Sequence, residues 1–236
     1  MPQTPAPVAP PQVDPQRFER TLNEALTHAS TLDGVWVFGY ASLIWRPEFE
    51  ACDVRAAQLV GWHRALRVRS RLNRGTPERP GLVFSLFQGG TCRGMAYKVS
   101  PNRVRDDLTR LWSREMVMSV YDPRWLTCRT ADGPVRALTF TLNRKHPSCT
   151  GTLSDEAMLD VLRHAQGRFG TTLDYLVQTH RGLLDVGICD PQIARLVALA
   201  QRDGLMPSDA VGVDQAAKPA TPSPSYFNRL LDPSTA

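Results

Sequence analysis

The sequence lacks the clustered cysteine and histidine residues from which metal sites and disulfide frameworks are built. Its five cysteines and five histidines are scattered along 236 residues, and no two cysteines form a C-x-x-C motif. Zinc sites need closely spaced ligands of these kinds, and disulfide-rich domains carry an even number of cysteines. We therefore expect no metal site and a reducing compartment.

The motifs of several large enzyme classes are also missing. There is no G-x-x-x-x-G-K-[ST], no G-x-G-x-x-G, no H-E-x-x-H and no G-x-S-x-G. These motifs bind phosphates, dinucleotides or zinc, or present a nucleophilic serine. Their absence leaves carboxylate chemistry as the main candidate for a catalytic site.

Long apolar runs are absent as well, since no stretch of about 18 apolar residues could span a membrane. The N-terminus has no basic segment followed by an apolar one, so we expect no signal peptide and a cytoplasmic protein. Residues 1–15 contain six prolines and residues 213–236 contain four, and both segments are expected to be flexible. Residues 16–212 are then expected to form a single domain.

Acidic residues are scarce in residues 55–79, which contain seven arginines and one acid, Glu78. Such a cluster is typical of a site for a carboxylate ligand or nucleic acid, or of a solvated strand edge whose charges discourage edge pairing. We favour the strand edge for the cluster as a whole. Arg67, Arg69 and Arg71 alternate and are expected on one face of a strand.

The spacing of apolar residues predicts strands in the first two thirds of the chain and helices mainly in the last third. Strands are expected at 35–40, 54–60, 65–71, 82–88, 95–99, 117–121, 125–129 and 135–142, with turns at Gly89-Gly90 and Asp132-Gly133. Helices are expected at 16–30, 101–114, 154–165, 172–184 and 190–204. This order indicates an α+β fold in which helices cover a mostly antiparallel, closed sheet.

Glu115 is the first candidate for a functional side chain. It follows an apolar helix face that ends at Trp112, and it precedes an apolar segment. A carboxylate at a helix C-terminus is disfavoured by about 0.3–1 kcal/mol, and apolar surroundings penalise its charge further. Both effects raise its pKa toward the range in which a general acid or base works. The alternative, which the local sequence favours, is a surface ion pair with a neighbouring arginine such as Arg114.

The stretch VWVFGYASLIWRPEF contains the second candidate. An apolar strand that reaches Tyr40 is followed by two small residues, Ala41 and Ser42. Small side chains let a ligand approach the backbone, and the N–H groups of a following helical turn would point at an anion. The alternative is an ordinary strand end.

Five segments in a fixed order carry a resemblance to a known family. They are VFGYASLIWRPEF, RGTPERPGLV, GGTCRGMAYKV, LWSREM and HPSCTG. Together they resemble the ChaC family, the glutathione-specific γ-glutamylcyclotransferases, from about Val35 to Leu199. The joint presence of a Tyr-Gly-Ser-Leu-like loop and a later Arg-Glu-Met is specific to that family.

The resemblance implies a γ-glutamylcyclotransferase-like α+β fold around a small β-barrel flanked by helices, with no metal and no organic cofactor. It implies cleavage of glutathione into 5-oxoproline and cysteinylglycine, with Glu115 as general acid and base. The family's loop for the γ-glutamyl group corresponds to Val37, Phe38, Gly39, Tyr40, Ala41, Ser42 and Leu43. Tyr121 corresponds to the family's tyrosine after the catalytic glutamate, and is either a substrate contact or a half-buried strand residue. Arg74, or one of the three alternating arginines, is a candidate for the glycine carboxylate.

Two positions depart from the family pattern. Ala41 stands where the family has glycine, which costs about 1 kcal/mol if the position needs a positive φ. Cys149 stands where the family's His-Pro-x-Tyr segment has tyrosine. Both changes leave the γ-glutamyl substrate open.

Two other functions stay open. One is a cyclotransferase for a different γ-glutamyl compound, such as a γ-glutamyl amine or amino acid. The other is a non-catalytic γ-glutamyl- or anion-binding module, or an RNA binder that uses residues 55–79. Against RNA, that segment contains one aromatic residue for base stacking, Trp62. We expect a small-molecule substrate, no nucleic acid and no membrane partner.

Overall fold

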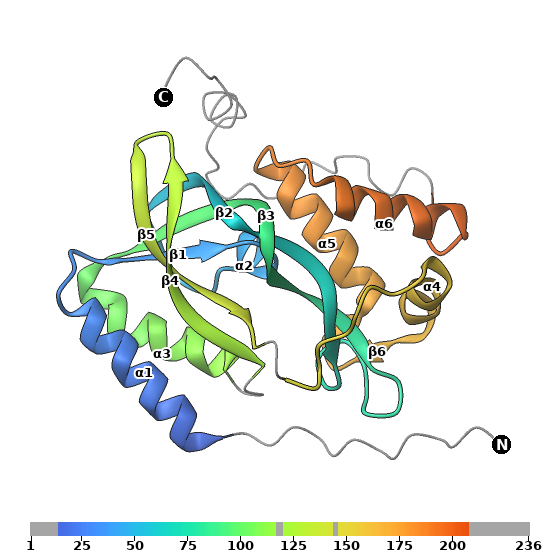
Figure 1. Cartoon of the computed structure of the whole chain (residues 1–236), viewed down its shortest axis with the longest axis horizontal. Coiled ribbons are helices and arrows are strands. Elements are labelled where there is room, and N and C mark those ends of the chain that lie inside the picture. The colour runs from blue at the N-terminus through green and yellow to red at the C-terminus, as the bar shows by residue number, and fades with distance from the viewer. Residues whose placement is uncertain (1–13, 117–119, 144–145, 208–236) are drawn as a thin grey trace.

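The computed structural model describes residues 14–116, 120–143 and 146–207, and five of its strands form a closed barrel (Figure 1). The strands are β1 Val35–Gly39, β2 Ala51–Ser70, β3 Gly81–Val99, β4 Tyr121–Thr130 and β5 Gly133–Leu142, in the order β1-β3-β2-β4-β5. The pairings β1–β3, β2–β3, β2–β4 and β4–β5 are antiparallel, and a parallel β1–β5 pairing closes the barrel. The predicted α+β fold with a mostly antiparallel barrel is confirmed.

β2 and β3 are continuous, whereas the sequence pattern predicted two shorter strands in place of each. Gly89-Gly90, predicted to be a turn, lies inside β3. The β2–β3 register shifts here, between Val60 and Trp62, and both glycines have positive φ, +98° and +72°. The prediction of a turn is therefore wrong. The freedom of the two glycines bends a long strand through a bulge instead of reversing the chain.

The helices form two groups on either side of the barrel (Figure 1). The first group is α1 Pro15–Ala29, the 3-10 turn η1 Pro101–Arg103 and α3 Val104–Glu115; the second is α4 Asp155–His164, α5 Thr172–Asp185 and α6 Pro191–Arg202. A single turn, α2 Ser42–Trp45, follows β1, and a small hairpin, β6 Gln166–Gly167 and β7 Gly170–Thr171, precedes α5. All five predicted helices are present, within a few residues of the expected ends.

Most of these helices begin at a residue that caps the first turn. Asp14, Ser154 and Asp190 each accept a hydrogen bond from a backbone N–H of the helix that follows. Thr171 forms a capping box with Asp174 at the start of α5. Such caps stabilise a helix by about 0.5–2 kcal/mol each. Because capping residues are recognisable in a sequence, helix starts of this kind can be predicted from it.

The two largest apolar clusters among the described residues connect the barrel with its helices. Phe38 belongs to the core shared with α5 and α6, and Val37 to the core shared with α1 and α3. Neighbouring residues of a strand point to opposite faces, so β1 contributes to both cores. Trp112 of α3 is fully buried in the second core, where its ring lies 5.3 Å from that of Phe140 and its Nε1 donates to Thr21 Oγ1. This packing fixes the last turn of α3, which ends at Glu115.

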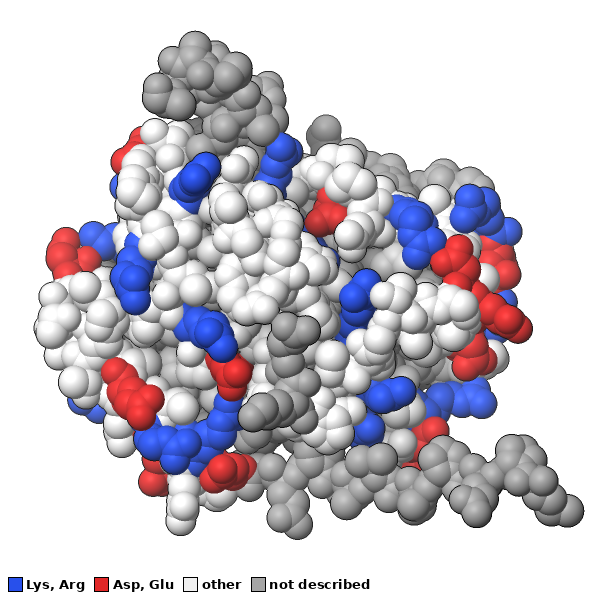
Figure 2. Space-filling view, viewed as in Figure 1, with Lys and Arg blue, Asp and Glu red and all other residues white. Residues whose placement is uncertain are grey.

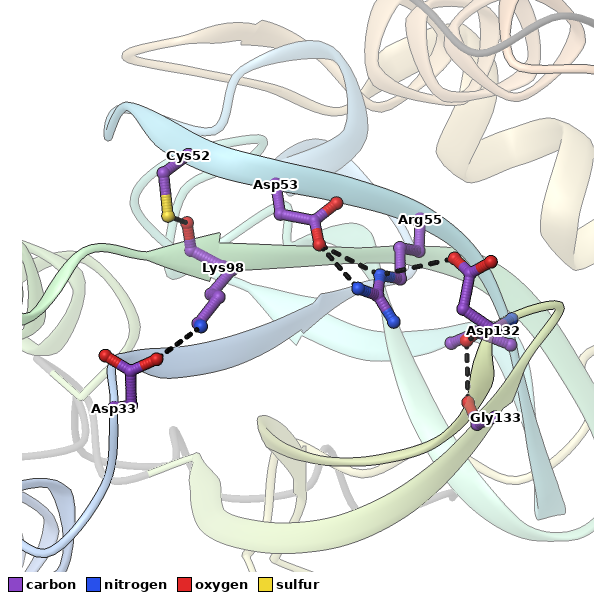
Figure 3. A network of polar contacts seen from close by, with 8 residues as sticks. Asp33, Cys52, Asp53, Arg55, Lys98, Asp132 and Gly133 are labelled. Carbon is purple, nitrogen blue, oxygen red and sulfur yellow. Dashed lines mark hydrogen bonds and ion pairs between the residues drawn. The ribbon is translucent and has the colours of Figure 1, made fainter.

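Ion pairs join the strands at the end of the barrel that carries the β4–β5 turn (Figure 3). Arg55 of β2 lies 2.7 Å from Asp53 and 3.5 Å from Asp132, and the turn predicted at Asp132-Gly133 is confirmed. Lys98 of β3 pairs with Asp33, just before β1. Ion pairs that are open to solvent contribute about 0–1 kcal/mol each, so the apolar cores contribute more to the stability of the barrel than these pairs do.

The flexible segments predicted at the two termini lie almost entirely outside the described residues. Residues 1–13 and 213–236 lie outside the described residues, and α1 begins at Pro15. The strand predicted at 117–121 falls partly on residues that the structure does not describe, and β4 begins at Tyr121. Among the described helices, none has the length and apolar character needed to cross a membrane.

Candidate active site

A cavity of about 550 Å³ lies where four parts of the fold meet. These parts are the end of α3, the short helix α2, the end of β2 with the loop after it, and the β6–β7 turn. A smaller space of about 30 Å³ adjoins it, because Ser42, Glu115, Tyr121 and Tyr175 line both. The larger volume is within the range of about 300–1,000 Å³ that is usual for small-molecule sites.

Glu115 sits at the junction of the two spaces. It is the last residue of α3, and its side chain is 15% exposed. Burial raises the pKa of its carboxyl group, the guanidinium of Arg114 lowers it, and the negative charge of Glu48 raises it. Burial is the largest of the three effects, so the net pKa lies above its usual value. A carboxyl group of this kind can accept and return a proton near neutral pH.

Arg114 holds the carboxylate and the α2 turn together. Its Nε lies 3.1 Å from Glu115 Oε1, and its Nη2 donates to Ser42 Oγ at 2.8 Å. Its Nη1 donates to the Arg46 carbonyl at 2.6 Å and lies 3.4 Å from Glu48. The sequence left open whether Glu115 forms an ion pair with Arg114 or occupies a buried position with a raised pKa, and the structure shows both features together.

Glu48 has an unusual backbone conformation for its position at the cavity wall. Among the described residues it is the one non-glycine residue with positive φ, at +61°. Such a conformation costs about 1–3 kcal/mol and persists where the surroundings hold it. Here the ion pairs to Arg46 at 2.7 Å and to Arg114 hold the side chain in the site.

The predicted binding loop divides into two parts. Tyr40, Ala41, Ser42 and Leu43 all line the smaller space together with Glu115. Ala41 has φ −144°, so this position does not need the positive φ that would favour glycine. The alanine found here therefore carries no cost from a positive φ.

The three residues before Tyr40 lie beneath the site. Val37 and Phe38 are fully buried in the two cores and are not among the residues that line either space. A Cβ atom on Gly39 would come within 3.0 Å of the Tyr97 ring and 3.1 Å of Leu43 Cβ. Gly39 therefore lets β1 pack closely where the α2 turn begins, and these three residues reach a ligand through their backbone or not at all.

Arg74 also lines the cavity. It is buried, and its Nη1 donates to the Phe169 carbonyl at 2.5 Å while its guanidinium lies 5.1 Å from the centre of the Tyr175 ring. Burial lowers its pKa, whereas the nearby carboxylate of Asp174 raises it, although no ion pair joins the two side chains. A buried arginine that forms no ion pair among the described residues is suited to the carboxylate of a ligand.

The arginines of residues 55–79 do not form one patch. Arg69 and Arg71 line the cavity beside Arg74, and Arg71 donates to Ser148 Oγ at 2.9 Å. Arg64 is buried in the protein, far from solvent. Figure 2 shows the charges of both signs intermixed on the face that it presents. The cluster in the sequence therefore separates into cavity arginines, a structural arginine and surface charges.

Tyr121 and Cys149, which the resemblance to the family brought into question, lie in different places. Tyr121 lines both spaces, and its hydroxyl group donates to the Phe84 carbonyl at 3.3 Å. Cys149 forms an isolated bridge with Val68 and packs against Val120 and Leu142, and it is not among the cavity-lining residues.

Tyr175 was not singled out in the sequence, although it lines both spaces. The available signal was its place on the inner face of the helix predicted at 172–184. Among the residues that the structure describes, no group of three His, Cys, Asp or Glu side chains could hold a metal ion. The arrangement combines a carboxyl group of raised pKa with arginines, which suits proton transfer on an anionic small molecule.

Comparison with known proteins agrees with this picture. The model of the family described as "ChaC-like protein" matches residues 35–203. The glutathione-specific gamma-glutamylcyclotransferase of Escherichia coli (strain K12) is 33% identical over 169 residues, covering 71% of this chain and 73% of that protein. Glutathione-specific gamma-glutamylcyclotransferase 1 of Homo sapiens is 31% identical over 180 residues, covering 73% and 79%.

A solved structure has the same fold. The crystal structure of a gamma-glutamyl cyclotransferase specific to glutathione from yeast superposes with a TM-score of 0.66. The match covers 72% of this chain and 97% of that one, at 17% sequence identity. At this identity the likeness concerns the fold alone.

Proposed function

The chain belongs to the ChaC family, and from this membership we propose that it is a γ-glutamylcyclotransferase that cleaves glutathione into 5-oxoproline and cysteinylglycine. The observation that carries the proposal is the buried Glu115, whose pKa is raised, beside a loop of small residues. We assign the activity to residues 16–212. The enzyme acts in the cytoplasm on a small molecule, and nucleic acid is not its substrate.

The reaction closes a ring within the substrate. The α-amine of the γ-glutamyl group attacks the γ-carbonyl carbon, and the bond to the cysteine nitrogen breaks. Because both reacting groups belong to one molecule, holding it in a folded shape supplies much of the acceleration. Glu115 accepts a proton from the attacking nitrogen and gives one to the departing nitrogen. The ring closure needs no nucleophile from the protein.

The charged groups of the substrate have matching partners in the cavity. Backbone N–H groups of Gly39 to Leu43 bind the α-carboxylate or the oxygen that becomes negative in the transition state. Arg74 binds the glycine carboxylate, a role supported by its burial and by its place in the cavity lining. Tyr121, which lines the cavity, contacts the substrate from β4.

The first test is an assay of the purified full-length protein with glutathione, in which 5-oxoproline is measured by mass spectrometry. Release of 5-oxoproline and cysteinylglycine in equal amounts is the expected result. Release from a γ-glutamyl amine or amino acid, with none from glutathione, would show a cyclotransferase of different specificity. No release from any of them by folded protein that still binds glutathione would show a non-catalytic binding module.

The charge of Glu48 is expected to influence the pH at which kcat/KM falls on the acid side of its pH profile. Glu115 must be ionised to accept a proton, so kcat/KM falls as the pH drops through its raised pKa. The negative charge of Glu48 helps to raise that pKa, so Glu48→Gln should lower it and move the acid limb to lower pH. The exposed Glu50, which pairs with Arg103, provides the control Glu50→Gln, whose profile should match the wild type. An unmoved limb in Glu48→Gln would contradict this electrostatic account.

Arg74→Gln is expected to raise the KM for glutathione by about ten- to one-hundred-fold with little change in kcat, because it removes a hydrogen bond between charged groups. The test substrate is glutathione whose glycine carboxylate is converted to an amide. The substitution should change its KM far less, since the interaction is already missing. Arg79→Gln, an exposed change on the same loop, is the matched control. Equal losses with both substrates would assign Arg74 a purely structural role.

A further inference from the structure

Three tyrosines surround Glu115 in the smaller of the two spaces. Tyr40 directly follows β1, Tyr121 begins β4 and Tyr175 belongs to α5, and each of them lines this space together with the carboxyl group. A tyrosine hydroxyl group can donate one hydrogen bond and can also accept one. Which of the two capacities is already used by the protein decides what each tyrosine can offer a substrate.

The hydroxyl hydrogens of Tyr40 and Tyr121 are already committed. Tyr40 Oη lies 2.9 Å from the Phe140 carbonyl oxygen, and Tyr121 Oη lies 3.3 Å from the Phe84 carbonyl oxygen. A carbonyl oxygen only accepts, so both tyrosines donate in these bonds. Their oxygens remain able to accept a hydrogen bond, but they have no hydrogen left for a substrate.

Tyr175 is bonded in the opposite direction. The backbone N–H of Phe84 donates to Tyr175 Oη, at 3.4 Å, so this oxygen is the acceptor. Among the described residues, no acceptor receives the hydroxyl hydrogen of Tyr175. Phe84 thus uses its N–H on Tyr175 and its carbonyl on Tyr121, which makes the two tyrosines chemically different although they are neighbours.

The position of the Tyr175 ring is fixed from three sides. The ring lies 5.6 Å from that of Phe84 and 6.4 Å from that of Trp45, and the guanidinium of Arg74 covers it at 5.1 Å. Burial raises the pKa of Tyr175 to about 12, so the hydroxyl group keeps its hydrogen at neutral pH. A neutral donor in a fixed position inside a buried space is suited to stabilise charge that develops in a transition state.

Building on the proposed function, we propose that Tyr175 donates a hydrogen bond to the γ-carbonyl oxygen of the substrate as that oxygen becomes negative. When the α-amine bonds to the γ-carbon, the electron pair of the C=O bond moves to this oxygen. The pair then returns, the bond to the cysteine nitrogen breaks, and that nitrogen takes its proton from Glu115. Tyr175 keeps its own proton throughout and acts only as a hydrogen-bond donor.

The test compares Tyr175→Phe with the wild type in full steady-state kinetics on glutathione. Removal of one preorganised donor to an oxyanion costs about 10²–10³-fold in kcat, and KM should stay within about threefold because the bond forms mainly in the transition state. Tyr97→Phe is the matched control. Tyr97 is also buried, and its hydroxyl donates to a backbone carbonyl, that of Ile44, but it lines neither space. Its kinetics should equal those of the wild type.

Binding to an inactive background separates the oxyanion role from substrate binding. Glu115→Gln and Glu115→Gln/Tyr175→Phe should bind glutathione with the same dissociation constant by calorimetry, and circular dichroism should show both folded. The inference would be overturned if the double variant bound glutathione more weakly by the same factor by which Tyr175→Phe lowers kcat. Full activity of Tyr175→Phe would overturn it as well. A wild-type protein without activity on any γ-glutamyl compound would instead refute the proposed function, and this role with it.

Discussion

Glu115→Gln is expected to lower kcat/KM for glutathione by about 10²–10⁴-fold, the range that a general acid and base contributes. Glutamine has nearly the same shape, so it fills the same position beside Arg114 but cannot accept the proton of the attacking amine. The measurement is the rate of 5-oxoproline release by mass spectrometry. Glu50→Gln, an exposed change of the same chemical type, should retain wild-type activity.

The same substitution is expected to stabilise the folded protein at neutral pH. The carboxyl group of Glu115 has a higher pKa in the folded protein than in the unfolded chain, so at neutral pH its ionisation favours the unfolded state. Removing the charge removes this penalty. The gain should therefore be present above the folded-state pKa and should disappear as the pH falls below the unfolded pKa, where the wild-type carboxyl group is protonated in both states.

Thermal unfolding of both proteins from pH 4 to pH 8 measures this difference. An inactive variant with higher stability at pH 8 and equal stability at pH 4 is the combined result expected from a catalytic group held in unfavourable surroundings. An active Glu115→Gln protein would show that another group acts as the general base. An inactive but strongly destabilised one would make Glu115 a structural residue.

The sequence predicted those parts of the fold whose signals are local. The N-caps of α4, α5 and α6 are Ser154, Thr171 and Asp190, whose side chains accept hydrogen bonds from N–H groups in the first turn of each helix. The length of β2 and β3 was missed because it depends on pairing between distant residues. Gly89-Gly90 has the local chemistry of a turn, and only the β2 strand beside it makes the pair a bulge.

The site was predicted in part for the same reason. Local sequence favoured a surface ion pair for Glu115, and its burial depends on Tyr175 and on the loop after β1, which lie far from it along the chain. The family resemblance supplied that loop, because it compares the segments jointly. It did not point to Tyr175, whose importance comes from the direction of one hydrogen bond to the backbone of Phe84.

Arg64 belongs to the arginine-rich segment 55–79, but its side chain is only 2% exposed. Composition alone therefore did not distinguish it from the surface arginines. Its Nε lies 2.8 Å from Asp190 Oδ2, and its two other nitrogens donate to the carbonyls of Tyr40 and Arg93. It therefore joins the N-terminus of α6, the end of β1 and β3. The Tyr40 carbonyl immediately precedes the small residues of the predicted binding loop.

Arg64→Met is expected to lower the free energy of unfolding by about 3–5 kcal/mol, because it leaves a carboxylate and two backbone carbonyls without this donor. Asp190→Asn should cost less, since asparagine still caps α6 and still accepts from Arg64. Arg79→Met, on the surface, should stay within about 0.5 kcal/mol of the wild type. Urea denaturation measures all three, and an unchanged slope with denaturant confirms that stability alone has changed. A loss of under about 1 kcal/mol in Arg64→Met would mean that water replaces the guanidinium, and the three elements would then be held by their apolar contacts.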